Sequence, residues 1–413
     1  MQVARSMPES GGSKDSGRAG LLDILRGFAI LGILLMNIQS FGLVSGAYLN
    51  PKALGEPPAA DYLVWLATHL LIDEKFIAIL TMLFGAGLIL MSERSKLSVA
   101  EFERVFRRRM LWLLAIGLAH GLLLWRGDIL TTYAICGAVA VYFRHMAPWQ
   151  LIKIAIALML VPTVIVILMS AGLQLLPEQR IAELTVKHWL PSREVIREEI
   201  ALYTGNWLAT AGARALNSLT IQAWMLVTER FWKVLALMLI GMALLRIGFL
   251  MGQWSGERYR RLGLAALAIG LPIVALGVAF NEYFDWDLRY SLYLGKLANY
   301  WASAVVALGW IALMALLAHY RLLGPVGRWL TAVGRLALSN YLLQTFICAT
   351  LFYGFGLGLY GQLDRASLLL IVLGIWVAQV VFSLWWLNHF RIGPFEWTWR
   401  RLAAKSLLAR SAA

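Results

Sequence analysis

The stretch that decides the fold is LLDILRGFAILGILLMNIQSFGL at residues 21–43, an apolar run long enough to cross a bilayer as one helix. It contains Asp23, Arg26 and Asn37, and a charged side chain costs about 3 kcal/mol near the bilayer centre. Arg26 and Asn37 stand 11 residues apart, which is about three turns, or roughly 16 Å of rise. The two side chains therefore lie at two depths on one side of the helix. This arrangement predicts a buried polar site that is reached from both faces of a membrane.

The rest of the chain is built in the same way. Of its 413 residues, 60% are hydrophobic and only 15% are charged, and apolar runs of about 20 residues recur along it. This composition predicts an all-α fold, a polytopic transmembrane helix bundle. We expect ten spans, at residues 21–43, 62–91, 110–125, 129–143, 149–173, 231–250, 262–281, 297–318, 336–357 and 367–389.

The formal net charge of +14 raises the question of nucleic-acid binding. The basic residues, however, gather at the ends of the expected spans and mostly in alternate loops. Loops rich in Lys and Arg face the cytoplasm in membrane proteins. The charge pattern therefore predicts that both termini are cytoplasmic, and it argues against a nucleic-acid partner.

We expect a single transmembrane domain at residues 21–401. A disordered cytoplasmic N-terminus (1–20) precedes it, and a basic cytoplasmic tail (402–413) follows it. Between residues 177 and 230, Glu and Arg alternate while apolar residues recur at helical spacing. This pattern predicts an external amphipathic segment on the membrane surface. The segment acts either as a lid over an external opening or as plain interfacial packing.

The second expected span is interrupted in its middle by Asp73, Glu74 and Lys75. Charges at that depth must face protein or water. We therefore expect a kink, a break, or two half-helices that meet in a cavity.

Two histidines, His69 and His120, fall inside expected spans, in the half nearer the outside. A lone histidine in a membrane usually makes an interhelical hydrogen bond and has no catalytic role. His120 differs because Asp128 follows it at the end of the same hairpin, and a carboxylate can orient an imidazole and increase its basicity. Contact between the two requires the end of the helix to bend back.

Arginines at the cytoplasmic ends are candidates for binding phosphate groups, because a guanidinium forms two parallel charge-assisted hydrogen bonds. Arg26 lies within a span, and Arg107, Arg108 and Arg109 form a cluster. For the cluster, the topology signal that the positive-inside rule already predicts is the stronger interpretation. Asp23 is a candidate cavity-lining residue, or a structural partner of Arg26.

Asn340 and Gln344 lie four residues apart on one helix face, where they either line a cavity or tie two helices together. Glu396 follows the last span, and we expect it to pair with Arg400 as a structural clamp. The chain has no metal-binding motif and no Walker or GxGxxG loop. We therefore expect no metal and no permanently bound cofactor.

Five stretches together resemble the YeiB-like bacterial membrane proteins, whose domain is catalogued as a domain of unknown function, number 418. The stretches are LDILRGFAILGILLMNIQSFG, KFIAILTMLFGAGL, FRRRMLWLLAIGLAHGLLLWRGDILTTYAICG, GRLALSNYLLQTFICATLFYGFGLGLYGQL and WLNHFRIGPFEWTWR. The resemblance covers about Leu21 to Arg401. It implies a multi-pass protein of the bacterial cytoplasmic (inner) membrane.

The first span is also similar to that of the transmembrane acyltransferases, which include the enzymes that acetylate cell-envelope sugars and the lysosomal heparan glucosaminide acetyltransferase. Their first span reads LDxLRGxA, with an Arg followed after ten residues by a His. Here Arg26 matches the Arg, but Asn37 stands where the His would be. Asn cannot take a proton, although it can orient a substrate or an oxyanion. The resemblance therefore implies a base on another helix, with His120 favoured over His69.

The leading hypothesis is acyl transfer from cytoplasmic acyl-CoA, as a co-substrate, to a small-molecule or envelope acceptor in the outer half of the bundle. Arg26 and the arginine cluster would hold the CoA phosphates, Asn37 would orient the acyl carbonyl, and His120 with Asp128 would act as base or acyl carrier. A transporter or flippase for a small polar or amphiphilic molecule is the alternative, since charged spans and a broken helix also suit transport. A third reading is a structural or sensing membrane partner.

Overall fold

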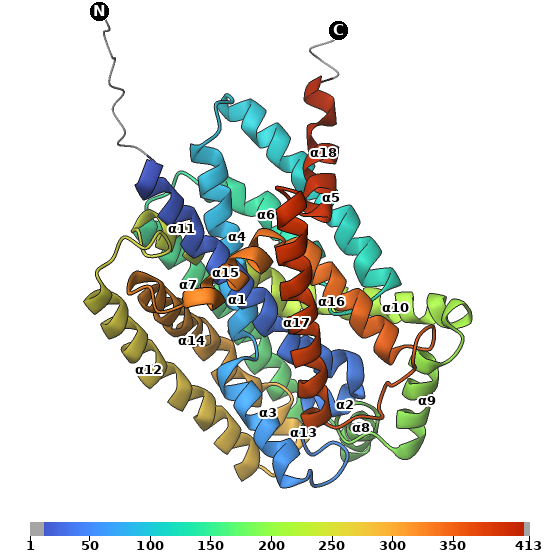
Figure 1. The fold of residues 1–413 in the computed structure, drawn as a ribbon. Helices are drawn as coiled ribbons and strands as arrows, with labels where there is room; N and C mark the ends of the chain where they lie inside the picture. Colours follow the sequence, from blue (N-terminus) through green and yellow to red (C-terminus); the bar gives the residue numbers. More distant parts are fainter. Residues whose placement is uncertain (1–11, 409–413) are drawn as a thin grey trace, which may run out of the picture.

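The computed structural model describes residues 12–408, and this part of the chain is built of helices (Figure 1). In chain order the helices are α1 (Gly12–Gly42), α2 (Ser45–Leu49), α3 (Ala59–Leu71), α4 (Lys75–Glu93), α5 (Val99–Leu123), α6 (Leu130–Ala140), η1 (Val141–Phe143), α7 (Pro148–Gln174), α8 (Glu178–Leu184), η2 (Thr185–Trp189), α9 (Arg193–Thr204), α10 (Trp207–Met225), η3 (Leu226–Arg230), α11 (Phe231–Arg246), α12 (Gly256–Tyr283), α13 (Leu288–Ser291), α14 (Leu294–His319), α15 (Gly324–Arg335), α16 (Ala337–Phe352), α17 (Arg365–His389) and α18 (Pro394–Leu408). Helix α1 begins at Gly12, so within the expected disordered N-terminus the described residues are helical. The rest of that stretch, 1–11, lies outside the described residues, as does 409–413 of the expected tail.

Six segments are long and apolar enough to cross a membrane: Gly20–Gly42, Ala59–Glu93, Pro148–Gln174, Gly256–Tyr283, Leu288–His319 and Arg365–His389. The expectation of an all-helical, multi-pass protein is therefore confirmed at this level. Four further expected spans correspond to α5, α6, α11 and α16. Helices α6 and α16 are apolar but shorter, α11 has 16 residues, and α5 begins with a charged stretch.

The ends of α1 and α18 that carry the chain termini lie at the same end of the bundle, at the top of Figure 1. We call this end the terminal face. Both α1 and α5 run away from it. The segment from α8 to α10 lies toward the opposite end and the side of the bundle.

The second expected span is broken into two helices. Helix α3 ends at Leu71, and α4 begins at Lys75. Glu74 between them has a left-handed backbone with φ of 64°, a conformation that ends a helix and is uncommon for residues other than Gly. Of the three outcomes expected here, the structure has two helices that meet at a break.

Close helix contacts hold the centre of the bundle together. At the crossing of α4 and α11, a Cβ atom on Gly85 would lie 2.0 Å from the Met238 carbonyl oxygen, and one on Gly241 would lie 1.9 Å from that of Met82. Glycines on both helices therefore let the backbones touch, as small residues do at membrane helix interfaces.

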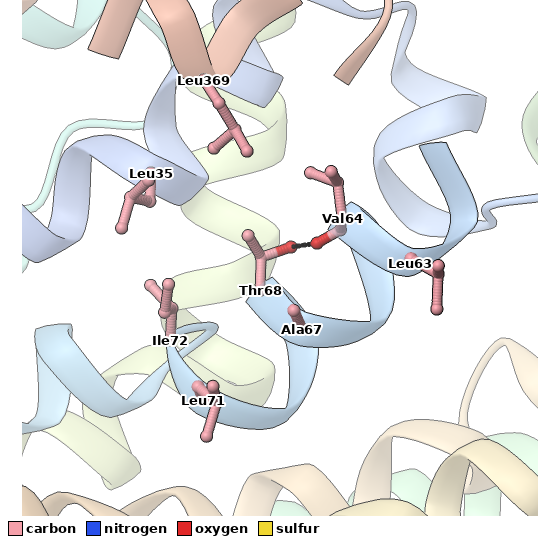
Figure 2. A pocket seen from close by; sticks show the side chains of 8 residues that line it. All are labelled: Leu35, Leu63, Val64, Ala67, Thr68, Leu71, Ile72 and Leu369. Atoms are coloured by element: carbon pink, nitrogen blue, oxygen red, sulfur yellow. Dashed lines mark hydrogen bonds between the residues drawn. The ribbon is translucent and has the colours of Figure 1, made fainter. Parts of the chain in front are cut away.

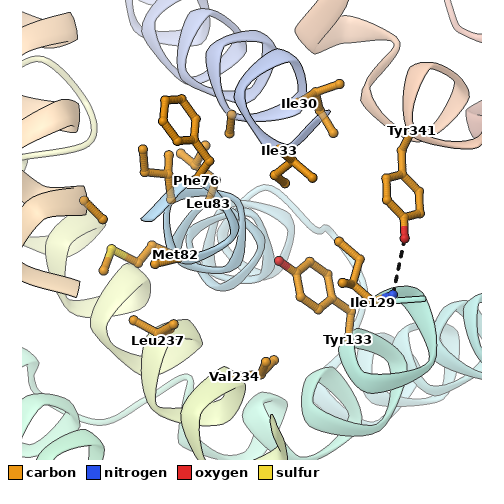
Figure 3. Close-up of a cluster of buried hydrophobic side chains, with 14 of the residues drawn as sticks. Ile30, Ile33, Phe76, Met82, Leu83, Ile129, Tyr133, Val234, Leu237 and Tyr341 are labelled. Carbon is orange, nitrogen blue, oxygen red and sulfur yellow. Dashed lines mark hydrogen bonds between the residues drawn. The ribbon is translucent and has the colours of Figure 1, made fainter. Parts of the chain in front are cut away.

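Helix α1 lies in the middle and packs against α4, α14, α15, α16 and α17. Its contact with α15 also depends on glycine, since a Cβ on Gly27 would lie 1.9 Å from the Leu330 carbonyl oxygen. Figure 3 shows the apolar core beside it. Side chains of α1, α4, α6 and α11 meet there, including Ile30, Ile33, Phe76, Met82, Leu83, Tyr133, Val234 and Leu237.

Two helices near the C-terminus were not expected from the sequence, α15 and α18. The role of Glu396 also differs from the expected pairing with Arg400. Its carboxylate accepts hydrogen bonds from the backbone N–H groups of Leu338 (2.7 Å) and Ser339 (3.1 Å). Glu396 thus clamps α18 to the start of α16, where unpaired backbone donors need an acceptor.

We predict that Gly241→Ala lowers the free energy of unfolding by about 1–3 kcal/mol, the usual range for overpacking. The added methyl group must push α11 away from the α4 backbone. Thermal unfolding in detergent measures the change. Gly374→Ala in α17 is the matched control, because a Cβ there meets no atom within 4 Å. Equal stability of the two variants would contradict the close packing of α4 and α11.

Candidate functional site

The hairpin of α5 and α6 brings His120 and Asp128 into contact. After α5 ends at Leu123, the backbone N–H groups of Leu124 and Trp125 both donate to the His120 carbonyl, so the chain turns back at once. The His120 Nδ1 atom lies 2.8 Å from Asp128 Oδ1. The two residues are only 3% and 1% exposed. The bend that contact requires is therefore present.

Asp128 holds this hairpin as well as the imidazole. Its carboxylate accepts hydrogen bonds from the backbone N–H groups of Leu130 (3.1 Å) and Thr131 (2.8 Å) at the start of α6. An Asp in this position satisfies donors that have no partner inside the helix. One carboxylate therefore fixes both the helix start and the orientation of His120.

The second imidazole nitrogen of His120 faces α16. Its Nε2 atom lies 2.9 Å from Thr345 Oγ1, and Thr345 is 1% exposed. With the Nδ1 proton donated to Asp128, Nε2 has the free lone pair and accepts from the Thr345 hydroxyl. One turn earlier on α16, the Tyr341 ring packs 5.3 Å from the imidazole. A carboxylate, an imidazole and a hydroxyl thus form one continuous buried chain of hydrogen bonds.

One buried hydrogen-bond donor near this chain has no acceptor among residues 12–408. The buried Trp125 indole N–H is unpaired, although its ring lies edge-on to His120 with centroids 6.4 Å apart. Trp125 stacks on Phe41 of α1 at 4.5 Å. Asn37 lies one turn before Phe41 on the same face of α1; it is half-buried and makes no side-chain hydrogen bond to the described residues. Buried unpaired donors are uncommon and mark places where an acceptor is expected.

A cavity of about 470 Å³ opens near the terminal face between α1, α4 and α5. Its lining includes three guanidinium groups, those of Arg26, Arg94 and Arg109. Asp23 pairs with Arg26 at 2.6 Å, and the Arg109 guanidinium stacks over the Trp399 ring at 4.8 Å. We call this cavity the arginine cavity. Three cations against one carboxylate suit a polyanionic ligand.

The three arginines of the predicted cluster differ in exposure, and they do not form one site on α5. Arg107 is exposed and Arg108 is half-buried, and only Arg109 lines the arginine cavity. Arg94 belongs to the cavity but was not among the sequence-predicted residues. Arg109 precedes His120 by 11 residues, the same spacing as from Arg26 to Asn37. On both helices the polar group therefore lies roughly 16 Å deeper than the arginine.

Asn340 and Gln344 lie in a buried amide ladder that joins helices. Asn340 donates to the Val333 carbonyl (3.2 Å) and to Ser383 Oγ (2.9 Å). Gln344 donates to the Ile30 carbonyl (3.0 Å) and to the side chain of Gln379 (2.9 Å). These contacts connect α1, α15, α16 and α17. They favour the role of tying helices together over the role of lining a cavity.

His69 lies at the break between α3 and α4. Its Nδ1 atom is 3.1 Å from Asp73 Oδ2, and Asp73 also accepts from the Asn299 side chain at 3.1 Å. The fully buried Lys75 ammonium donates to Asn299 and to the His69 carbonyl. His69 is therefore separate from the His120 chain and part of another polar group.

That group is larger than the sequence indicated. It gathers charges from α4, η3, α11 and α14, and we call it the central ionic cluster: Asp73, Glu74, Lys75, Glu229, Arg230, Lys233 and Lys296. Lys233 pairs with Glu74. Glu229 and Arg230 lie in the π-helical turn η3, and such turns within helices are frequent at functional sites. Arg230 and Lys296 keep accessible surface and have no ion pair within the described part of the chain.

The central ionic cluster reaches toward the His120 chain. Burial, with the nearby carboxylate of Asp73, raises the pKa of the Tyr48 phenol in α2, while Arg230 and Arg126 oppose this shift. Arg230 also acts electrostatically on Tyr341, the ring beside His120. Arg230 thus interacts electrostatically with residues beside both polar groups. Part of this cluster has a signal in the sequence, because Lys233 falls inside an expected apolar span.

The expected external segment covers the His120 hairpin. Ser218 of α10 donates to the Gly121 carbonyl at 2.7 Å. On α9, the Glu199 carboxylate accepts from Tyr360 at 2.7 Å and from the Ser45 backbone at 3.0 Å. Arg126, in the turn before Asp128, donates to Ser45 Oγ at 2.7 Å. These contacts join the segment to the turn that carries Asp128.

A second cavity, of about 390 Å³, lies between α1, α3 and α17 (Figure 2). Its lining is Leu35, Leu63, Val64, Ala67, Thr68, Leu71, Ile72 and Leu369. The Thr68 hydroxyl is satisfied by the Val64 carbonyl at 2.8 Å. With no charged group in its lining, this cavity suits a hydrocarbon chain and no polar reaction.

Comparison with known proteins identifies relatives of this chain. It is 35% identical over 399 residues to the uncharacterized protein YeiB of Escherichia coli (strain K12), covering 93% of this chain and 96% of the relative. It is 31% identical over 401 residues to the uncharacterized protein YxaH of Bacillus subtilis (strain 168), covering 93% of each. Residues 244–406 match the family described as a protein of unknown function (DUF418).

The chain belongs to the YeiB-like DUF418 family. It is also 27% identical over 389 residues to an uncharacterized 39.9 kDa protein of Bacillus acidopullulyticus, covering 93% of each. No solved structure gives a significant match. These relatives establish the family to which the chain belongs. Their names state no activity, so the chemistry has to be argued from the geometry of the site.

We predict that Asp128→Ala lowers the free energy of unfolding by about 2–3 kcal/mol, because it removes a helix cap and leaves a buried imidazole donor unpaired. Asp128→Asn should cost less, since its amide oxygen can still accept from His120 and the Leu130 N–H, although its amide nitrogen cannot accept from the Thr131 N–H. Chemical unfolding in detergent measures both, with the exposed Glu194→Ala in α9 as control. An Asp128→Ala variant as stable as the control would show that this carboxylate does not hold the hairpin.

Proposed function

We propose that this protein is a membrane acyltransferase that takes an acyl group from acyl-CoA at the terminal face. It passes the group to an acceptor held in the opposite half of the bundle. The observation that carries the proposal is the buried chain of Asp128, His120 and Thr345, with distances of 2.8 Å and 2.9 Å. A base oriented by a carboxylate and bonded to a hydroxyl is the arrangement that acyl transfer requires.

The arginine cavity is the donor end of the proposed site. Arg26, Arg94 and Arg109 would bind the phosphates of CoA, and the positive-inside rule places this end in the cytoplasm. The thioester would extend along α1 and α5 toward Asn37 and His120, roughly 16 Å deeper. In this proposal the protein lies in the bacterial cytoplasmic (inner) membrane.

In the proposed reaction, His120 Nε2 removes a proton from the attacking hydroxyl or amine, which then bonds to the thioester carbonyl carbon. The C–S bond breaks, and the departing CoA thiolate takes up a proton. Asp128 stabilises the imidazolium that forms. Asn37 would donate to the carbonyl oxygen as negative charge develops there.

The central ionic cluster is the proposed place for a polar acceptor. Arg230, a member of the cluster, interacts electrostatically with Tyr341, the ring that packs against His120. Arg230 and Lys296 have no ion pair within the described residues, and both keep accessible surface. A small-molecule or envelope acceptor with polar or anionic groups fits these side chains.

A transporter or flippase is the second candidate, and one observation favours it. The helix break at Glu74 with its charged neighbours resembles the discontinuous helices that bind substrates in transporters. Uptake of a labelled polar solute by proteoliposomes that contain no acyl donor would favour this function over the enzyme.

Acyl-CoA should stabilise the detergent-purified protein against heat, by about 2.7 kcal/mol at a concentration 100 times its dissociation constant. The combined variant Arg26→Ala with Arg109→Ala should lose this stabilisation, because two of three cavity cations are gone. Differential scanning fluorimetry with acetyl-CoA and palmitoyl-CoA measures it. Arg104→Ala is the control, an exposed residue of the same helix. A shift that persists in the double variant would rule out the arginine cavity as the CoA site.

His120→Ala should reduce the transfer of radiolabelled acyl groups to membrane or envelope acceptors about 100-fold or more, the usual contribution of a general base. The assay uses vesicles that contain equal amounts of each variant. His188→Ala, an exposed residue of the external segment, should retain the normal rate. Transfer at the normal rate by His120→Ala would refute the assignment of the base.

A further inference from the structure

We infer that Thr345 carries the acyl group as a covalent ester, so that transfer proceeds in two steps through an acyl-enzyme. This inference rests on the proposed function and names a nucleophile for it. Thr345 Oγ1 is the group that His120 Nε2 already contacts, at 2.9 Å. A nucleophile hydrogen-bonded to a base, with the base oriented by a third group, is the general signature of covalent catalysis.

The position of Thr345 is fixed from two sides. On α16, Tyr341 one turn earlier accepts a hydrogen bond from the Ile129 N–H at 3.4 Å and packs against His120. Asp128 holds the other imidazole nitrogen. The hydroxyl, imidazole and carboxylate therefore come from three segments, α16, α5 and the turn before α6. Their mutual positions do not depend on a mobile side chain at the surface.

A second observation points to a missing carbonyl oxygen. The Trp125 indole N–H is buried without an acceptor, and its ring lies edge-on to the imidazole. Trp125 stacks on Phe41 of α1, one turn from the half-buried Asn37. A threonine that served only to orient His120 would leave the buried indole donor unexplained. An ester on Thr345 would supply an acceptor for it.

The two steps balance as follows. His120 Nε2 takes the Thr345 hydroxyl proton while Oγ1 bonds to the thioester carbonyl carbon; the C–S bond breaks, and the thiolate of CoA leaves with that proton. In the second step the acceptor hydroxyl or amine gives its proton to His120 and attacks the ester carbonyl. The C–Oγ1 bond then breaks, and Thr345 regains a proton from His120. No oxidant, metal or further reactant is needed.

A carrier also explains why the two ends of the site are apart. The arginine cavity opens near the terminal face, and the central ionic cluster lies at the break between α3 and α4. With an acyl-enzyme between them, CoA can leave before the acceptor arrives. The two substrates then never need to occupy the buried centre together.

The test is exchange of radiolabelled CoA into acetyl-CoA or palmitoyl-CoA by the purified full-length protein, with no acceptor present. If Thr345 carries the acyl group, we expect this exchange to occur. Mass spectrometry should also detect the added mass of the acyl group on the peptide that contains Thr345. Thr345→Ser should retain both the exchange and the adduct, because it keeps the hydroxyl. Thr345→Val, matched in size, should lose both, and its thermal unfolding shows whether it is folded.

The outcomes separate this inference from the proposed function. If Thr345→Val is folded and still transfers acyl groups to an acceptor without any adduct, the carrier is wrong and direct transfer stands. An adduct on a residue other than Thr345 also overturns the carrier assignment. If the wild-type protein shows neither exchange nor transfer with these donors, both the carrier and the acyltransferase proposal fail.

Discussion

The rest of the site depends on one buried contact, that between the Asp128 carboxylate and the His120 imidazole. The same carboxylate caps α6, so the geometry of the α5–α6 hairpin and the orientation of the imidazole are set together. A charged group in an apolar interior is tolerated when its hydrogen bonds are all made. Here two backbone donors and a ring nitrogen satisfy it. The cost of burying Asp128 is thereby offset by the hairpin that it holds.

The bundle arranges its polar groups at two depths around this contact. Parallel helices α1 and α5 each place an arginine near the terminal face and a polar group 11 residues further along. Beside α1, apolar side chains that include Ile30 and Ile33 form the core shown in Figure 3. Close glycine contacts hold α4 against α11 and α1 against α15. The fold thus places three arginines at one level and a hydrogen-bonded histidine at the other.

Much of the fold could be predicted from the sequence, because length and apolar composition decide whether a helix can span a membrane. The break at Asp73, Glu74 and Lys75 was also predictable, because charged side chains in the middle of a span cannot face lipid. Helix α15 was not predicted, because it is short and its contact with α1 depends on glycine positions that carry no hydrophobic signal. Spacing along one helix also could not show that Glu396 caps a distant helix.

The candidate site was predictable in part. The pairing of His120 with Asp128 followed from their places on one hairpin. Thr345 could not be found, since a threonine in an apolar span is ordinary and its contact with His120 joins residues 225 positions apart. Only part of the central ionic cluster could be predicted from the sequence. Asp73 and its neighbours stand out in the sequence, whereas Glu229 and Arg230 enter through a π-helical turn that residue spacing does not reveal.

The central claim is that acyl groups enter this buried polar chain from the terminal face and leave toward the opposite side. Sidedness tests it most directly, by measuring transfer in sealed vesicles of known orientation with acyl-CoA supplied to one face at a time. The account predicts that labelled acyl groups reach an acceptor only when acyl-CoA is on the face that carries the termini. Transfer driven by acyl-CoA on the opposite face alone, or none from either face, would contradict it.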